Sequence, residues 1–95
     1  MATSRARVPT AAAGKYLRQL CKHFAHKVAV DYDDTEARVD FPFGVCRMSA
    51  DAEALSIFCD APHEQALATM HGVVERHLVQ FAWRERLAGV DWERI

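Results

Sequence analysis

The segment that decides the fold is ARVDFPFGVCRMSADAEALSIFC, residues 37–59, because apolar and polar residues alternate along it. Ala37 and Val39 face one way while Arg38 and Asp40 face the other, which is the period of a half-buried β-strand. Such a strand places its apolar side chains against a core. The segment therefore predicts a sheet with one buried face.

Turn signals divide this segment into three strands. Pro42-Phe43-Gly44 interrupts the first alternation, and Ser49-Ala50-Asp51 ends the second. The last strand has its own alternation, with Leu55, Ile57 and Cys59 inward and Ser56 and Phe58 outward.

Two more strands are predicted earlier in the chain. Residues 4–8 place Ala6 and Val8 on one side and two arginines on the other, and Pro9 ends this strand. Residues 28–32 alternate in the same way before the polar run 33–35, which supplies a turn.

Two stretches have the period of a buried helical stripe. The first begins after a possible Thr10 cap and runs to about His26, with apolar positions 13, 17, 20, 21 and 24. The second begins at Pro62 and ends near Leu87, with Gly89 as a stop and with apolar positions 67, 70, 74, 78 and 81. Val90 and Trp92 then tuck against the core or form one more short strand.

The predicted order is β-α-β-β-β-β-α within a single domain, residues 1–95. An antiparallel sheet with both helices on one face buries each apolar stripe once, so we expect a two-layer α+β fold. This arrangement is similar to one half of the TATA-binding-protein fold. The similarity concerns topology and implies no function.

Composition excludes several classes of protein. The chain has 12 Lys+Arg against 13 Asp+Glu, a formal charge of -1, so no overall field attracts nucleic acid or an anionic membrane. The three cysteines form no C-x-x-C pair, which favours reduced core thiols and a cytoplasmic location. Neither a signal peptide nor an apolar run of about 20 residues is present, so we expect neither export nor membrane insertion.

The sequence contains no catalytic template, which disfavours an enzyme, and it identifies no cofactor. A nucleophile motif, a glycine-rich phosphate loop and a zinc-protease motif are all absent. Cys21, His23 and His26 have the spacing of metal ligands, but their side chains diverge around a helix. We therefore assign no metal ligands.

A flank of the first predicted helix carries the first candidate site. His23 and Lys27 lie four residues apart and share this flank with Tyr16, and His77 could approach from the second helix if the two pack side by side. Such a cluster could bind a metal or an anion. The alternative is a pair of boundary histidines that donate hydrogen bonds at a helix seam.

The outward face of the predicted sheet carries the second candidate. Four arginines surround an aromatic side chain there, namely Arg5, Arg7, Arg38 and Arg47 around Phe58. This face could contact a phosphate-bearing ligand, a single nucleic-acid strand or a second copy of the protein. The alternative is a solvated face with weak cross-strand ion pairs.

Three segments, YLRQLCKHFAHK, ARVDFPFGVCRMSAD and ERHLVQFAWRE, resemble the DUF2218 family of uncharacterised bacterial proteins over nearly the whole chain. The matching positions are Tyr16, Leu17, Leu20, His23, Phe24, Lys27, Phe41, Gly44, Cys46, Arg47, Arg76, His77, Leu78 and Phe81. Trp83 and Arg86 depart from the pattern, where Phe and Pro are expected. The resemblance implies a domain without an assigned activity and, because such domains occur joined to flavin-dependent siderophore-interacting reductases, a link with siderophore metabolism.

The sequence thus predicts a noncatalytic binding or assembly module, a possible homodimer that serves a partner protein or a small ligand. Metal or ferric-ligand binding through the histidines is the alternative. Single-stranded nucleic-acid binding is a third possibility, which the net charge disfavours.

Overall fold

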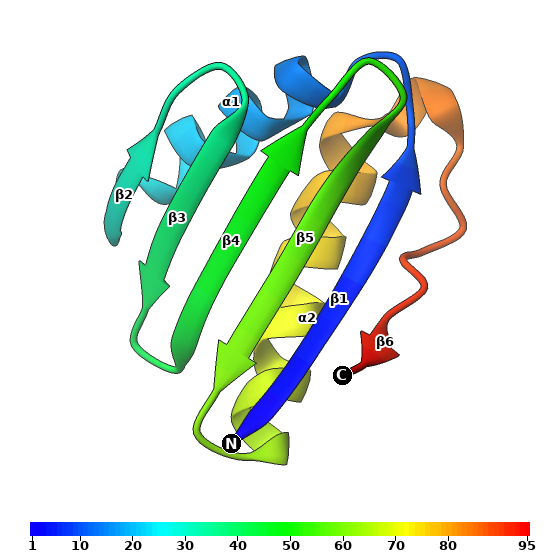
Figure 1. Cartoon of the computed structure of the whole chain (residues 1–95). Coiled ribbons are helices and arrows are strands. Elements are labelled where there is room, and N and C mark those ends of the chain that lie inside the picture. The colour runs from blue at the N-terminus through cyan, green and yellow to red at the C-terminus, as the bar shows by residue number, and fades with distance from the viewer.

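A computed structural model covers residues 1–95 and shows the predicted α+β fold, with both helices packed on one face of an antiparallel sheet (Figure 1). The six strands lie in the order β2-β3-β4-β5-β1-β6. In chain order the elements are β1 (Ala2–Pro9), α1 (Ala13–Phe24), β2 (Ala29–Tyr32), β3 (Glu36–Phe41), β4 (Gly44–Ala50), β5 (Ala54–Ala61), α2 (Glu64–Phe81), a 3-10 turn (Trp83–Glu85) and β6 (Glu93–Arg94).

Strands β2 to β5 form an antiparallel meander, and β1 pairs with the free side of β5. Their turns come from the expected residues, and Gly44 between β3 and β4 is required by geometry. It has φ +153°, and a Cβ there would lie 2.4 Å from both the Asp60 carbonyl oxygen and Met70 Cε. Glycine therefore lets this hairpin pass close under α2.

The core lies between the inner sheet face and the apolar stripes of the two helices. Leu17 and Leu20 of α1, Met70 and Leu78 of α2, and Ile57 of β5 are fully buried in it. This confirms both predicted stripes and the inward side of the last predicted strand. Helix α1 covers β2 to β5, whereas α2 covers β4, β5 and β1.

The three cysteines are free and buried, as predicted. Cys46 faces Cys59 directly across β4 and β5. A hydrogen bond with Cys59, followed by burial, raises the pKa of the Cys46 thiol well above its ordinary value, and burial raises the pKa of Cys21 to about 11. The Cys21 and Cys46 thiols are therefore held in the unreactive protonated form.

Both predicted ends of the first helix need correction. The helix ends at Phe24 rather than His26, because the His26 and Lys27 N–H groups bond to carbonyls three residues back and tighten the chain into a turn. Thr10 is not the cap, since Ala12 occupies that position. The Thr10 hydroxyl instead accepts the Ala12 N–H at 3.0 Å and donates to Glu85 at 2.9 Å.

The second helix is shorter at both ends than predicted. His63 is its N-cap, with Nδ1 accepting the Ala66 N–H at 3.1 Å. The helix ends at Phe81 rather than near Leu87, because the 3-10 turn follows and Arg86 takes the left-handed conformation directly after it. Apolar periodicity runs through this turn, so it could not locate the end.

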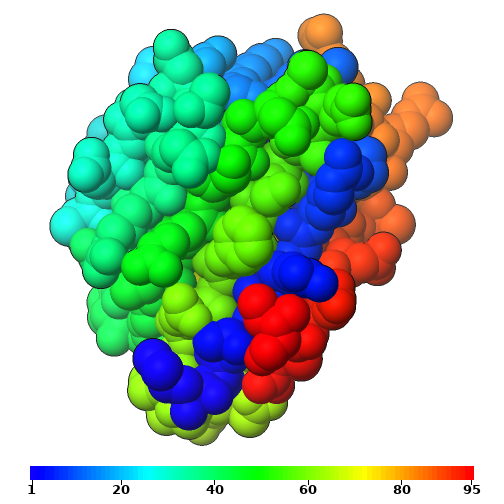
Figure 2. All heavy atoms as spheres, in the orientation of Figure 1, coloured from blue at the N-terminus to red at the C-terminus, as the bar shows by residue number.

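The C-terminal segment follows the first of the two alternatives predicted for Val90 and Trp92, and a short strand forms just after them. Val90 and Trp92 pack against the core, and β6 pairs with β1. The Trp92 ring stacks on His71 at 4.0 Å, and the His71 Nε2 lies 2.6 Å from the hydroxyl of buried Ser4. In Figure 2 this red segment lies along the blue strand β1, while no helix covers the outer sheet face. No helix is both long and apolar enough to cross a membrane.

Candidate functional site

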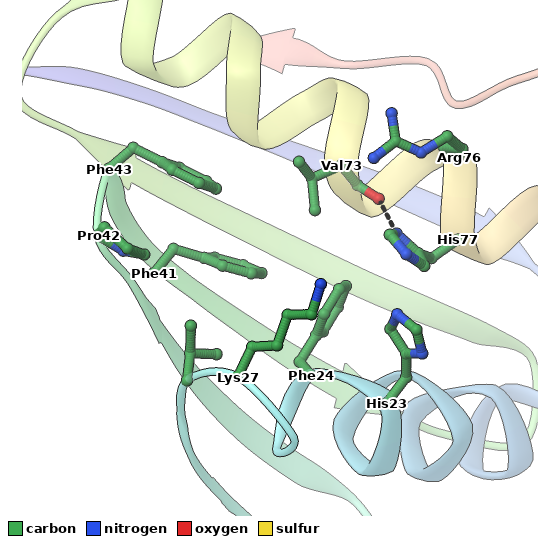
Figure 3. A pocket seen from close by; sticks show the side chains of 10 residues that line it. His23, Phe24, Lys27, Phe41, Pro42, Phe43, Val73, Arg76 and His77 are labelled. Carbon is green, nitrogen blue, oxygen red and sulfur yellow. Dashed lines mark hydrogen bonds between the residues drawn. The ribbon is translucent and has the colours of Figure 1, made fainter.

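A pocket of about 420 Å³ lies where the C-terminal end of α1, the β3–β4 hairpin and the middle of α2 meet. Ligand pockets typically measure about 300–1,000 Å³, so this one can take a small organic molecule. Ten side chains line it: His23, Phe24, Lys27, Val28, Phe41, Pro42, Phe43, Val73, Arg76 and His77 (Figure 3).

Aromatic rings form a continuous wall of the pocket. Phe24 is only 5% exposed and makes edge-on contacts with Phe41 at 5.0 Å and with His77 at 5.2 Å between ring centroids. Phe41 stacks on Phe43, also at 5.0 Å. Phe41 and Phe43 stay partly exposed, so they keep ring surface available to a ligand.

Two histidines from facing helices meet at one end of this wall. The rings of His23 and His77 have centroids 4.4 Å apart, and they face each other in Figure 3. The Nδ1 of His77 lies 2.6 Å from the Val73 carbonyl oxygen. Because a carbonyl only accepts, Nδ1 carries the proton, and Nε2 is the atom of His77 that remains free to meet a ligand.

The electrostatics of the pocket are uniformly positive. None of its ten lining residues is acidic. Six ion pairs form elsewhere in the protein, and neither Lys27 nor Arg76 takes part in any of them. Figure 3 shows Lys27 extending beside Phe24 toward α2, so its ammonium group points across the pocket.

The same charges act on His23. Removal from water, and then the positive charges of His77, His26 and Lys27, hold the pKa of His23 below its ordinary value. The dipole of α1 attracts cations to its C-terminal end, where Lys22 and His23 lie in the last turn. It does not account for Arg76 or His77, which lie within α2.

The structure brings together three of the four predicted ligand-binding residues: His23, Lys27 and His77. Tyr16 does not line this pocket. It precedes His23 by seven residues, which keeps it on the same flank but places it about 10 Å along the helix axis. Tyr16 is 6% exposed and bonds to Glu85, which raises the pKa of its phenol.

Arg76, Val73 and the β3–β4 hairpin were not among the predicted site residues. Two signals could have found them. Arg76 adjoins His77 in the sequence, and Phe41 and Phe43 follow the same inward alternation as Val39. What the sequence lacked was the position of this hairpin relative to the end of α1.

The predicted arginine face also forms, as one row across the sheet. Arg38, Arg47, Phe58 and Arg5 stand directly opposite one another on β3, β4, β5 and β1, and Arg7 lies in a neighbouring row. Phe58 is 41% exposed. Each arginine has a carboxylate nearby: Arg5 with Glu93 at 3.3 Å, Arg7 with Glu53 at 3.7 Å, Arg38 with Asp40 at 3.0 Å and Arg47 with Asp60 at 3.9 Å.

No group of three or more His, Cys, Asp or Glu side chains is placed to hold a metal ion. His23 and His77 alone give two ligands, whereas zinc sites in proteins use three or four. The metal-binding alternative would therefore need the bound molecule to supply the remaining donor atoms.

Comparison with known proteins finds one matching family and a similar solved structure. Residues 5–93 match the family described as "Uncharacterized protein conserved in bacteria (DUF2218)". Among solved structures, the NMR structure of PA4090 from Pseudomonas aeruginosa is 32% identical, with a TM-score of 0.81, over 98% of this chain and 96% of that chain. Comparison with curated proteins gives no match.

Proposed function

We propose that this chain, which belongs to the DUF2218 family of uncharacterised bacterial proteins, is a binding protein for small organic anions with a flat apolar body. One observation carries the proposal: a pocket with an aromatic wall holds cationic side chains that have no carboxylate partner. Of the two roles predicted from the sequence, service to a partner protein or to a small ligand, the proposal chooses the small ligand.

The aromatic wall supports a flat body for the ligand. Phe41 and Phe43 are stacked within 10° of parallel, so together they offer a ring-sized surface, and Phe24 closes its inner edge. A planar apolar group laid on this wall gains burial of its own surface and of the partly exposed rings. A purely inorganic anion would leave the aromatic rings of this wall exposed to water and would gain nothing from their burial.

The cations support a negative charge on the ligand. Lys27 lies beside the aromatic wall and Arg76 lies on the α2 side, with the histidine pair between the helices. An anion bound there would meet several N–H donors and no competing carboxylate. Charge and apolar surface thus converge on one amphiphilic ligand.

Three probes test this reading by isothermal titration calorimetry. Naphthalene-2-sulfonate has the flat body and a permanent charge, 2-naphthalenemethanol has the body without the charge, and methanesulfonate has the charge without the body. We expect naphthalene-2-sulfonate to bind at least about tenfold more tightly than either of the others, because only it uses both features of the pocket. Equal affinity for naphthalene-2-sulfonate and 2-naphthalenemethanol would overturn the proposed preference for anions.

A matched pair of variants assigns the binding to this pocket. Lys27→Gln with Arg76→Gln removes two pocket charges, while Arg38→Gln with Arg47→Gln removes the same charge from the sheet face. We expect the first pair to weaken binding at least about tenfold and the second to leave it within about twofold. Equal loss in both would show a general charge effect and no pocket.

A further inference from the structure

We infer that anion binding in this pocket is coupled to proton uptake by the His23–His77 pair. This inference rests on the proposed function and adds its regulation: the site binds more tightly as the pH falls through the range in which histidines titrate. Two observations carry it, the contact between the two rings and the hydrogen bond that fixes one of them.

The first observation is the crowding of positive charge around the pair. The charged or titratable groups that face it are Lys27 and His26 from the α1 side and Arg76 from α2, while the β3–β4 hairpin contributes only Phe41, Pro42 and Phe43. No carboxylate offsets them. Two imidazoles 4.4 Å apart in this setting resist both being protonated at once.

The second observation is the fixed orientation of His77. Its Nδ1–H donates to the Val73 carbonyl, and this bond persists when the ring gains a proton, because the new proton enters at Nε2. Protonation therefore needs no rearrangement of His77. It converts Nε2 from a hydrogen-bond acceptor into a donor that can meet an anion.

A bound anion shifts the two histidines from the neutral form toward the protonated form. A negative charge within about 4–6 Å of a titratable cation favours its protonated form and raises its pKa by about 1–3 units. In the free protein the pKa of His23 is below its ordinary value, so the ring is mainly neutral near neutral pH. Affinity is therefore highest at low pH and is lost as the pH rises through the pKa of the complex.

The test measures the dissociation constant of naphthalene-2-sulfonate from about pH 6 to about pH 8, because its sulfonate stays charged across this range and histidine does not. Bis-Tris propane chloride at fixed ionic strength buffers this range and avoids competing buffer anions. We expect affinity to fall at least about tenfold over this interval. Binding with no pH dependence would overturn the coupling and leave the anion-binding function standing, whereas no binding at any pH would overturn both.

Two variants assign the effect to the pair. His23→Gln with His77→Gln keeps an amide donor at both positions but leaves neither ring to titrate, so the pH dependence should fall to about twofold or less. His71→Gln removes a histidine that stacks on Trp92 and does not line the pocket, and the full pH dependence should remain. A double variant that keeps the wild-type pH profile would contradict the inference, and an unchanged circular dichroism spectrum shows that each variant is folded.

Discussion

The pocket and the outer sheet face both carry clustered cations, but they differ in how those charges are compensated. On the sheet face Arg5, Arg38 and Arg47 each have a carboxylate within 4 Å. In the pocket Lys27 and Arg76 have none, although the whole chain carries more acids than bases. A count of charges along the sequence would rank the arginine face first, whereas the pairing of charges in space points to the pocket.

The aromatic residues differ between the two regions in the same way. Phe24 in the pocket is 5% exposed and contacts three other rings, whereas Phe58 on the sheet face is 41% exposed. The wall of the pocket is therefore part of the core as well as the surface that we propose binds a ligand. The sheet face can change with little effect on the rest of the fold.

The largest expected effect comes from truncating these two aromatic residues. Phe24→Ala should lower the free energy of unfolding by about 3–5 kcal/mol, because it leaves a cavity between α1, β3 and α2. Phe58→Ala should cost about 1 kcal/mol or less, mainly through lost cross-strand contacts. Urea unfolding followed by circular dichroism measures both. Similar losses of unfolding free energy in the two variants would show that Phe24 contributes no more to the core than Phe58 does.

A pair of glycines tests how the pocket wall is positioned. Gly44→Ala should cost about 2 kcal/mol and displace Phe43, because its Cβ would collide with the Asp60 carbonyl oxygen at a φ that disfavours alanine. Gly72, exposed in α2 with open space around it, is the control. Gly72→Ala should stabilise the protein by about 0.5–1 kcal/mol. A neutral Gly44→Ala would show that the hairpin does not need its close approach.

Charge reversal in the pocket should affect binding more than stability. Lys27→Glu places a carboxylate beside the aromatic wall and should weaken naphthalene-2-sulfonate binding at least about thirtyfold, since it replaces attraction by repulsion. Lys22→Glu makes the same change of charge in the last turn of α1, outside the pocket. Its expected effect is about threefold or less, from long-range charge alone. Calorimetry at matched salt would contradict this account if both variants lost affinity equally.

The smallest effect is expected for self-association through the sheet face. The homodimer stays a prediction, and its arginines would have to exchange their own carboxylates for those of a second copy, which leaves a small net gain. Arg38→Glu with Arg47→Glu should shift the mass in native mass spectrometry from dimer to monomer. The same mass for wild type and variant at matched concentration would contradict a dimer built on this face.

The fold was predictable from sequence because it depends on periodicity. Alternation placed Leu55, Ile57 and Cys59 inward, and the helical stripes placed Leu20 and Met70 in the core. The ends of the helices were harder to predict from sequence, because the apolar pattern continues past Phe81 into the 3-10 turn and toward Leu87. Ends depend on local hydrogen bonds, such as the His63 cap, that periodicity does not encode.

The site was predictable only in part for a related reason. Helical spacing gives the direction of a side chain around the axis, and this was sufficient to group His23 with Lys27 and to anticipate His77. It does not show which neighbouring element covers each turn, so Tyr16 was grouped with them although it contacts Glu85. Pairing of the sheet-face arginines with carboxylates likewise depends on strand register, which places Asp60 beside Arg47 only once the sheet is assembled.

The central claim is that the pocket, and not the arginine face, binds small organic anions. The most direct test is a titration of ¹⁵N-labelled protein with naphthalene-2-sulfonate, followed by amide chemical shifts in heteronuclear NMR spectra. We expect saturable shifts at Phe24, Lys27, Phe43 and His77, with little change along the outer row of the sheet. Shifts concentrated at Arg47 and Phe58 instead would contradict it.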